Sequence, residues 1–150
     1  MRFTPYLLLC ICFLIVIGRH AFAADNNRME KEILQLTNQY RKSKGLPSLQ
    51  PDDASNIQAG IHSRNMARKR VRFGHDGFQK RVQQISESLG RLEASAENVA
   101  YGQESAAEVV RTWINSAPHR KNLLGNYTKI GIGVAQNKEG QYYFTQIFIR

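Results

Sequence analysis

The chain has 150 residues and a formal charge of +9, from 21 Lys and Arg against 12 Asp and Glu. This length suits one domain that buries about two-thirds of its unfolded surface. Both cysteines, Cys10 and Cys12, lie near the N-terminus, so the remainder cannot be a disulfide scaffold. The densest basic cluster, Arg64 to Arg72, has no aromatic residues within it, so nucleic acid is not the expected partner.

The N-terminal segment has the order of a secretory signal peptide. Arg2 precedes an apolar run from Tyr6 to Ile17, and Ala21-Phe22-Ala23 follows. The run has 12 residues, whereas a helix that crosses a bilayer needs about 20, so an uncleaved anchor is the weaker alternative. We predict a signal peptide of residues 1–23, cleaved after Ala23, and a secreted basic domain of residues 24–150 without a transmembrane span.

Apolar residues spaced three and four positions apart predict three helices in the first part of this domain. The first ends before Gly45. The second has Asp52 or Asp53 as its N-cap and ends near Arg70, and the third stops at Gly90. Their predicted apolar faces are Met29, Ile33, Leu36 and Tyr40; then Ile57, Ile61, Met66 and Ala67; then Phe78, Val82, Ile85 and Leu89.

The C-terminal part begins with a fourth helix and then changes its period. A capping box, Ser105 to Glu108, starts the helix, and Pro118 separates it from a short helical turn. From Ile130 to Ala135 apolar residues alternate with small ones, and residues 141–149 are rich in aromatic and β-branched side chains. We predict an antiparallel hairpin, whose glycines leave room for a helix packed close to the sheet.

Two histidines are candidates for a site because they lie in loops. His75 lies in a glycine-flanked turn and His119 follows Pro118, so both can project toward a shared cleft. A neutral imidazole there can bind a metal or transfer a proton. The alternative, a structural hydrogen-bonding role, stays open for both residues and is the expectation for His62, which lies within a predicted helix.

Glu97 stands among small and apolar residues, so its carboxylate requires a partner. That partner is an imidazolium, a backbone N–H group or a metal, or else Glu97 forms an internal salt bridge. The chain has no zinc-protease helix, nucleophile elbow, phosphate loop or calcium loop. An enzyme on this chain would therefore have to use histidine, carboxylate and water, with or without a metal.

Five segments, taken together, resemble the bacterial branch of the cysteine-rich secretory protein, antigen 5 and pathogenesis-related 1 (CAP) superfamily. They are His62 to Ala67, Phe73 to His75, Ala96 to Ala100, Trp113 to Leu124 and Ile130 to Val134. The resemblance implies an α+β fold, an α-β-α sandwich with a small antiparallel sheet between helical layers. It also implies a further strand near residues 95–100.

The resemblance implies a cleft with two histidines and two glutamates. In this chain His75, His119 and Glu97 match three of these residues, and Ser116 takes the place of the second glutamate. Such a cleft holds zinc in some members, so His75, Glu97 and His119 are candidate zinc ligands. We expect a noncatalytic binding module for a divalent metal or small ligand, with an envelope, cell-wall or host component as partner. The alternatives are a metal- or histidine-dependent hydrolase of peptide or cell-wall substrates, and a protein that binds a lipid or sterol.

Overall fold

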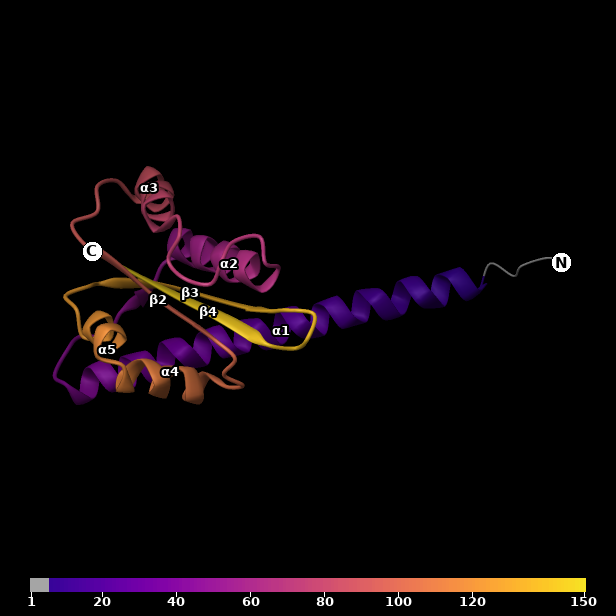
Figure 1. Ribbon diagram of the computed structural model, residues 1–150, viewed down its shortest axis with the longest axis horizontal. Coiled ribbons are helices and arrows are strands. Elements are labelled where there is room, and N and C mark those ends of the chain that lie inside the picture. Colours follow the sequence, from indigo (N-terminus) through magenta and orange to yellow (C-terminus); the bar gives the residue numbers. More distant parts are fainter. Residues whose placement is uncertain (1–5) are drawn as a thin grey trace.

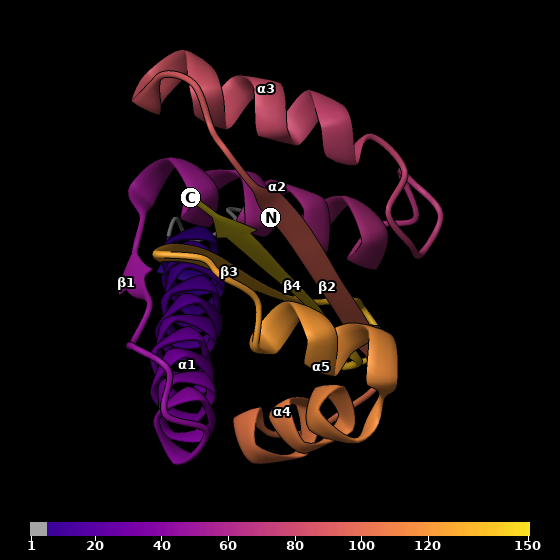
Figure 2. The ribbon, with the colours of Figure 1, turned by 90° about the vertical axis from the view of Figure 1, so that its left-hand side faces the viewer.

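The computed structural model describes residues 6–150, with side chains from Asp25 onward. The chain forms a four-stranded sheet between two helical layers (Figures 1 and 2). One layer contains α1 (Tyr6–Ser43), α4 (Ala106–Asn115) and α5 (Ala117–Leu123), and the other contains α2 (Asp53–Ala67) and α3 (Phe78–Leu89). The predicted α+β class and the α-β-α sandwich are both confirmed.

The sheet has the order β1-β3-β4-β2. Strands β3 (Lys129–Gln136) and β4 (Tyr142–Ile149) form the predicted antiparallel hairpin, and β2 (Ser95–Tyr101) pairs antiparallel with β4, as the resemblance implied. The parallel strand β1 (Gln50–Pro51) was not predicted, because two residues that include a proline carry no periodic signal. It leaves β2 as the edge strand on the other side of the sheet.

The helix boundaries agree with most of the sequence signals. Helix α1 ends at Ser43, before Gly45, whose φ is 73°. The Asp52 side chain accepts the backbone N–H of Ser55 at the start of α2. Helix α1 begins at Tyr6, well before the predicted apolar face that starts at Met29. Of the predicted signal peptide, residues 1–5 lie outside the described residues and residues 6–23 form the first part of this helix. No helix in the described part of the chain is long and apolar enough to cross a membrane.

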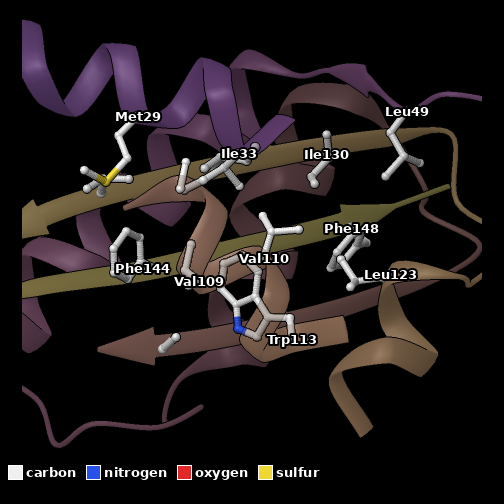
Figure 3. Packing of buried hydrophobic residues seen from close by; sticks show 14 residues of the cluster. Met29, Ile33, Leu49, Val109, Val110, Trp113, Leu123, Ile130, Phe144 and Phe148 are labelled. Carbon is white, nitrogen blue, oxygen red and sulfur yellow. The ribbon is translucent and has the colours of Figure 1, made fainter. Parts of the chain in front are cut away.

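The face of the sheet toward α1 and α4 is packed with large apolar side chains (Figure 3). Trp113 of α4 lies fully buried among Val110 and Phe148, and Ile33 of α1 covers the same face. Phe144 is also fully buried. The burial of these side chains supplies the main hydrophobic stabilisation of the domain, at about 25 cal/mol for each Å² removed from water.

Where α2 crosses strand β3, the opposite face is packed by backbone and small residues, which corrects the Ile57 and Ile61 part of the predicted apolar face of α2. Ile57 is 58% exposed and Ile61 also faces solvent, whereas Ala59 is fully buried against the sheet. A side chain at Gly131 or Gly133 would collide with the α2 backbone at Ser55 or Ala59. The glycines therefore let α2 lie directly on the sheet, as predicted, with Ala59 against the strands and Ile57 and Ile61 turned outward. Met66 and Ala67, at the C-terminal end of the predicted apolar face, are buried as expected.

Candidate functional site

The candidate site lies at the exposed edge of the sheet, where β2 separates the two helical layers. Successive side chains of a strand point to opposite faces. Accordingly, the Glu97 carboxylate contacts Arg81 of α3, whereas the Asn98 side-chain amide donates to the backbone oxygen of His119 in α5, at 3.3 Å. One strand thus contributes to two polar clusters, one on each face of the sheet.

The first cluster surrounds the Glu97 carboxylate, whose side chain is 1% exposed. The Arg81 guanidinium donates to both carboxylate oxygens, from Nε to Oε2 and from Nη2 to Oε1, each at 2.8 Å. His75 Nδ1 lies 2.9 Å from Oε1. This arrangement is a buried, bidentate ion pair with a third hydrogen bond, so the internal salt bridge that the sequence left open does form.

Arg81 was not among the predicted site residues, although its position in the sequence marks it as unusual. It lies three residues after Phe78 and four before Ile85, on the apolar stripe of α3, and it is buried. A cation on such a stripe requires a buried anion. Its second Nη atom also donates to the backbone oxygen of Asp76 at 2.9 Å, so Arg81 fixes both Glu97 and the turn that carries His75.

His75 is the exposed member of this cluster, with 52% of its side chain accessible. A hydrogen bond donated from Nδ1 to Glu97 leaves Nε2 as the free acceptor of a neutral ring. Nε2 has no hydrogen-bond partner among the described side chains and backbone. His75 can therefore present an oriented hydrogen-bonding nitrogen to a ligand.

His62 has the structural role expected of it. Its Nε2 donates to the backbone oxygen of Gly74 at 2.8 Å, and this bond ties α2 to the turn that contains His75. Burial lowers the pKa of His62, and the nearby positive charge of Arg81 lowers the pKa further. His62 is therefore neutral at neutral pH, which suits a buried donor beside a guanidinium.

The second cluster joins Ser116 and His119, which lie where α4 ends and α5 begins. His119 Nδ1 is 2.7 Å from Ser116 Oγ. Burial lowers the pKa of His119, and the charge of His75 lowers the pKa further, so the imidazole is neutral and can accept the serine hydroxyl. Asn122 of α5 donates to the backbone oxygen of Glu97 at 3.2 Å and holds this cluster against the strand edge.

The structure thus brings the predicted residues together as two pairs, His75 with Glu97 and His119 with Ser116. Within the described chain, no three or more His, Cys, Asp or Glu side chains are grouped to hold a metal ion. Both oxygens of Glu97 are already engaged, and the Arg81 cation beside them opposes a second cation. In this arrangement His75, Glu97 and His119 do not fit a three-ligand zinc centre.

Residues 34–148 match the cysteine-rich secretory protein family, CAP, and the chain belongs to this family. It is 36% identical over 123 residues to the Bacillus subtilis protein YkwD, covering 80% of this chain and 46% of YkwD. It is 34% identical over 124 residues to the B. subtilis membrane protein YlbC, covering 81% of this chain and 34% of YlbC. The chain therefore spans less than half the length of these relatives.

Solved structures show the same fold. An extracellular Bacillus anthracis protein containing an SCP domain aligns with a TM-score of 0.76 at 26% identity, covering 100% of this chain and 45% of that one. A cysteine-rich secretory protein from Staphylococcus aureus gives 0.67 at 26% identity, covering 83% and 39%. An outer surface protein of Borrelia burgdorferi gives 0.70 at 24% identity, covering 80% and 90%, and supports the fold alone.

Proposed function

We propose that this protein is a secreted, noncatalytic binding module in which two polar pairs, His75 with Glu97 and His119 with Ser116, border a cleft that holds a small ligand. The extracellular description of the similar Bacillus anthracis structure supports the secreted location. The observation that carries the proposal is the state of Glu97, whose carboxylate is buried and bound by Arg81 and His75. These three residues form a rigid, hydrogen-bonded support that presents the exposed His75 ring.

The same observation argues against catalysis by Glu97. A general base needs a free lone pair directed at the substrate or water. The Arg81 guanidinium instead binds both oxygens of Glu97, so neither oxygen is directed at a substrate or water. The residues are therefore arranged to hold a ligand in place and not to transfer its protons.

A hydrolase is the second candidate, because a carboxylate orients the His75 ring through Nδ1 at 2.9 Å. Nε2 would then accept a proton from water that attacks a peptide or wall substrate. This candidate requires turnover, which a binding module does not show. Lipid binding stays a prediction of the family resemblance.

Calorimetric titration at neutral pH separates these functions, with zinc and tri-alanine as probes. The protein is compared with His75→Ala, His119→Ala and, as a matched control outside the cleft, Ser88→Ala on the exposed side of α3. Saturable binding of either probe that both histidine variants lose and Ser88→Ala keeps supports the cleft. Cleavage of tri-alanine, followed by chromatography and abolished in the same variants, would replace the binding module by the hydrolase.

Zinc separates two further outcomes. One-site zinc binding would mean that Glu97 leaves Arg81 to complete the predicted ligand set with His75 and His119. Binding of tri-alanine without zinc would keep the cleft as a site for an organic ligand. Failure of both probes to bind would contradict the proposed cleft function.

A further inference from the structure

A basic groove lies away from the cleft, where the C-terminal end of α2 meets the turn between β3 and β4. Its volume is about 410 Å³, and Arg68, Lys69 and Lys138 line it together with a single carboxylate, Glu139. In the described part of the chain none of these three cations forms an ion pair. The groove therefore presents unneutralised positive charge to solvent.

Lys69 occupies a backbone conformation that favours glycine. Its φ is 56°, and among the described residues no other non-glycine has a positive φ. The position closes α2, because Arg70 N–H donates to the Asn65 oxygen and Lys69 N–H to the Met66 oxygen, each at 2.9 Å. Glycine is the usual residue here, and a left-handed side chain costs about 1 kcal/mol. A strained lysine that lines a groove points to a role in binding.

Three aromatic rings extend from this groove across the same face. Tyr143 packs with Ala67, which also lines the groove. Tyr101 stacks on Tyr143, with ring centroids 5.7 Å apart, and Phe73 meets Tyr101 edge-on at 4.8 Å. Tyr101 is 50% exposed and Phe73 is similarly exposed. Large aromatic surface left in water marks a place where a partner binds.

We propose that this basic-aromatic face, made by Arg68, Lys69, Phe73, Tyr101 and Lys138, binds an acidic polysaccharide. Carboxylate or phosphate groups on the polymer would pair with the three cations. The apolar C–H face of a sugar ring would pack on the exposed Tyr101 and Phe73 rings, and this contact would remove apolar area from water. The partner therefore has to carry both regularly spaced acidic groups and flat saturated rings.

The arrangement favours a polysaccharide over the other polyanions. Phe73 and Tyr101 are inclined at 62°, so they do not form parallel platforms for successive nucleic-acid bases. The rings also pack on one another beside a groove, whereas interfacial membrane binding uses the broad apolar face of an amphipathic helix. The cleft of His75 and His119 is not needed for this binding, so the two proposals fail independently.

The test is fluorescence anisotropy of labelled polygalacturonate with the purified protein, at low and high salt, with neutral dextran as the uncharged control. We expect binding to polygalacturonate that weakens with salt and no binding to dextran. Lys69→Gly and Lys138→Ala should each weaken binding about fivefold. Because glycine accepts the conformation of residue 69, Lys69→Gly should keep or raise the melting temperature, which separates lost binding from lost folding.

Two further variants test the specificity of the face. Tyr101→Ala should weaken binding to polygalacturonate and leave binding to polyglutamate, a polyanion without sugar rings, unchanged. Arg111→Ala, an exposed cation on α4 across the sheet, should leave both unchanged. Equal losses in Arg111→Ala and Lys138→Ala would reduce the effect to net charge and overturn the proposal. Tighter binding to a single-stranded oligonucleotide or to phosphatidylglycerol vesicles than to polygalacturonate would overturn it as well.

Discussion

The two faces of the sheet are stabilised by different means. Toward α1 and α4, bulky side chains such as Trp113 and Phe144 fill the space between helix and sheet. Toward α2, Gly131 and Gly133 bring two backbones into direct contact, and polar groups such as the Ser63 hydroxyl are buried beside them. The first face gains stability from apolar area, and the second gains it from close fit and from hydrogen bonds with fixed geometry.

The close fit on the α2 side holds the His75 and Glu97 half of the site. Polar side chains hold precise positions only where their neighbours fix them, and the α2 face fixes Glu97 through Arg81 and the turn of His75 through His62. The face toward α1, α4 and α5 also fixes polar groups within its apolar packing, since Asn98 donates to Gln146 and Gln146 donates to Thr37 of α1.

Trp113→Ala should destabilise the apolar face most, by about 3–5 kcal/mol, because it leaves a cavity in a fully buried position. The free energy of unfolding in urea measures the loss. Ile57→Ala on the exposed side of α2 is the control and should change stability by less than about 0.5 kcal/mol. A large loss in Ile57→Ala would mean that α2 packs through its isoleucines after all.

Arg81→Met should cost about 3 kcal/mol, because it leaves the buried Glu97 carboxylate without its cation. The double variant Arg81→Met/Glu97→Gln should recover most of this loss, since no charge is then buried. Arg72→Met, which removes only the exposed ion pair with Asp76, should change the urea midpoint little. If the double variant were no more stable than Arg81→Met, charge burial would not be the cause.

Gly133→Ala should destabilise the protein by about 1–3 kcal/mol, because its new methyl group meets the α2 backbone at Ala59 and Gly60. Gly60→Ala is a matched control in the same helix, since its methyl group would meet only the flexible Arg64 side chain. It should be neutral or stabilising because alanine favours the helix by about 1 kcal/mol over glycine. In thermal unfolding, the melting temperature should therefore fall for Gly133→Ala and stay unchanged or rise for Gly60→Ala.

The smallest predicted effect is a loss of stability as the pH falls below about 6.5. The pKa values of His62 and His119 are lowered in the folded protein, mainly by burial. The unfolded chain therefore takes up protons first, so stability is full above the unfolded pKa and declines as the pH falls through the folded values. His62→Gln, which can still donate to Gly74, should flatten the pH dependence of the urea midpoint. An unchanged slope would remove His62 as a cause.

Much of the fold follows from local pattern. The apolar periods of α1, α3 and α4, the hairpin and its glycines are all visible in sequence because each depends on residues within one element. The capping box also forms, although the Glu108 carboxylate binds the N–H of Glu104 at 2.9 Å instead of that of Ser105. For α2 the predicted apolar face was right for Met66 and Ala67 and wrong for Ile57 and Ile61, because periodicity cannot detect that glycines in a distant strand select the small residue Ala59.

The candidate site residues stay a prediction, and their arrangement in space could not be predicted from the sequence. The sequence and the family resemblance identify His75, Glu97, Ser116 and His119, and the structure divides them into two pairs on opposite sides of β2. Arg81 and the pairing of Phe73 with Tyr101 depend on contacts between segments far apart in the chain. Which groups carry charge and chemistry is readable from the amino-acid sequence, because these are properties of single residues. The neutralisation of Glu97 by Arg81 and the shared face of the basic and aromatic residues are visible only in the folded chain, because both depend on distances that packing sets.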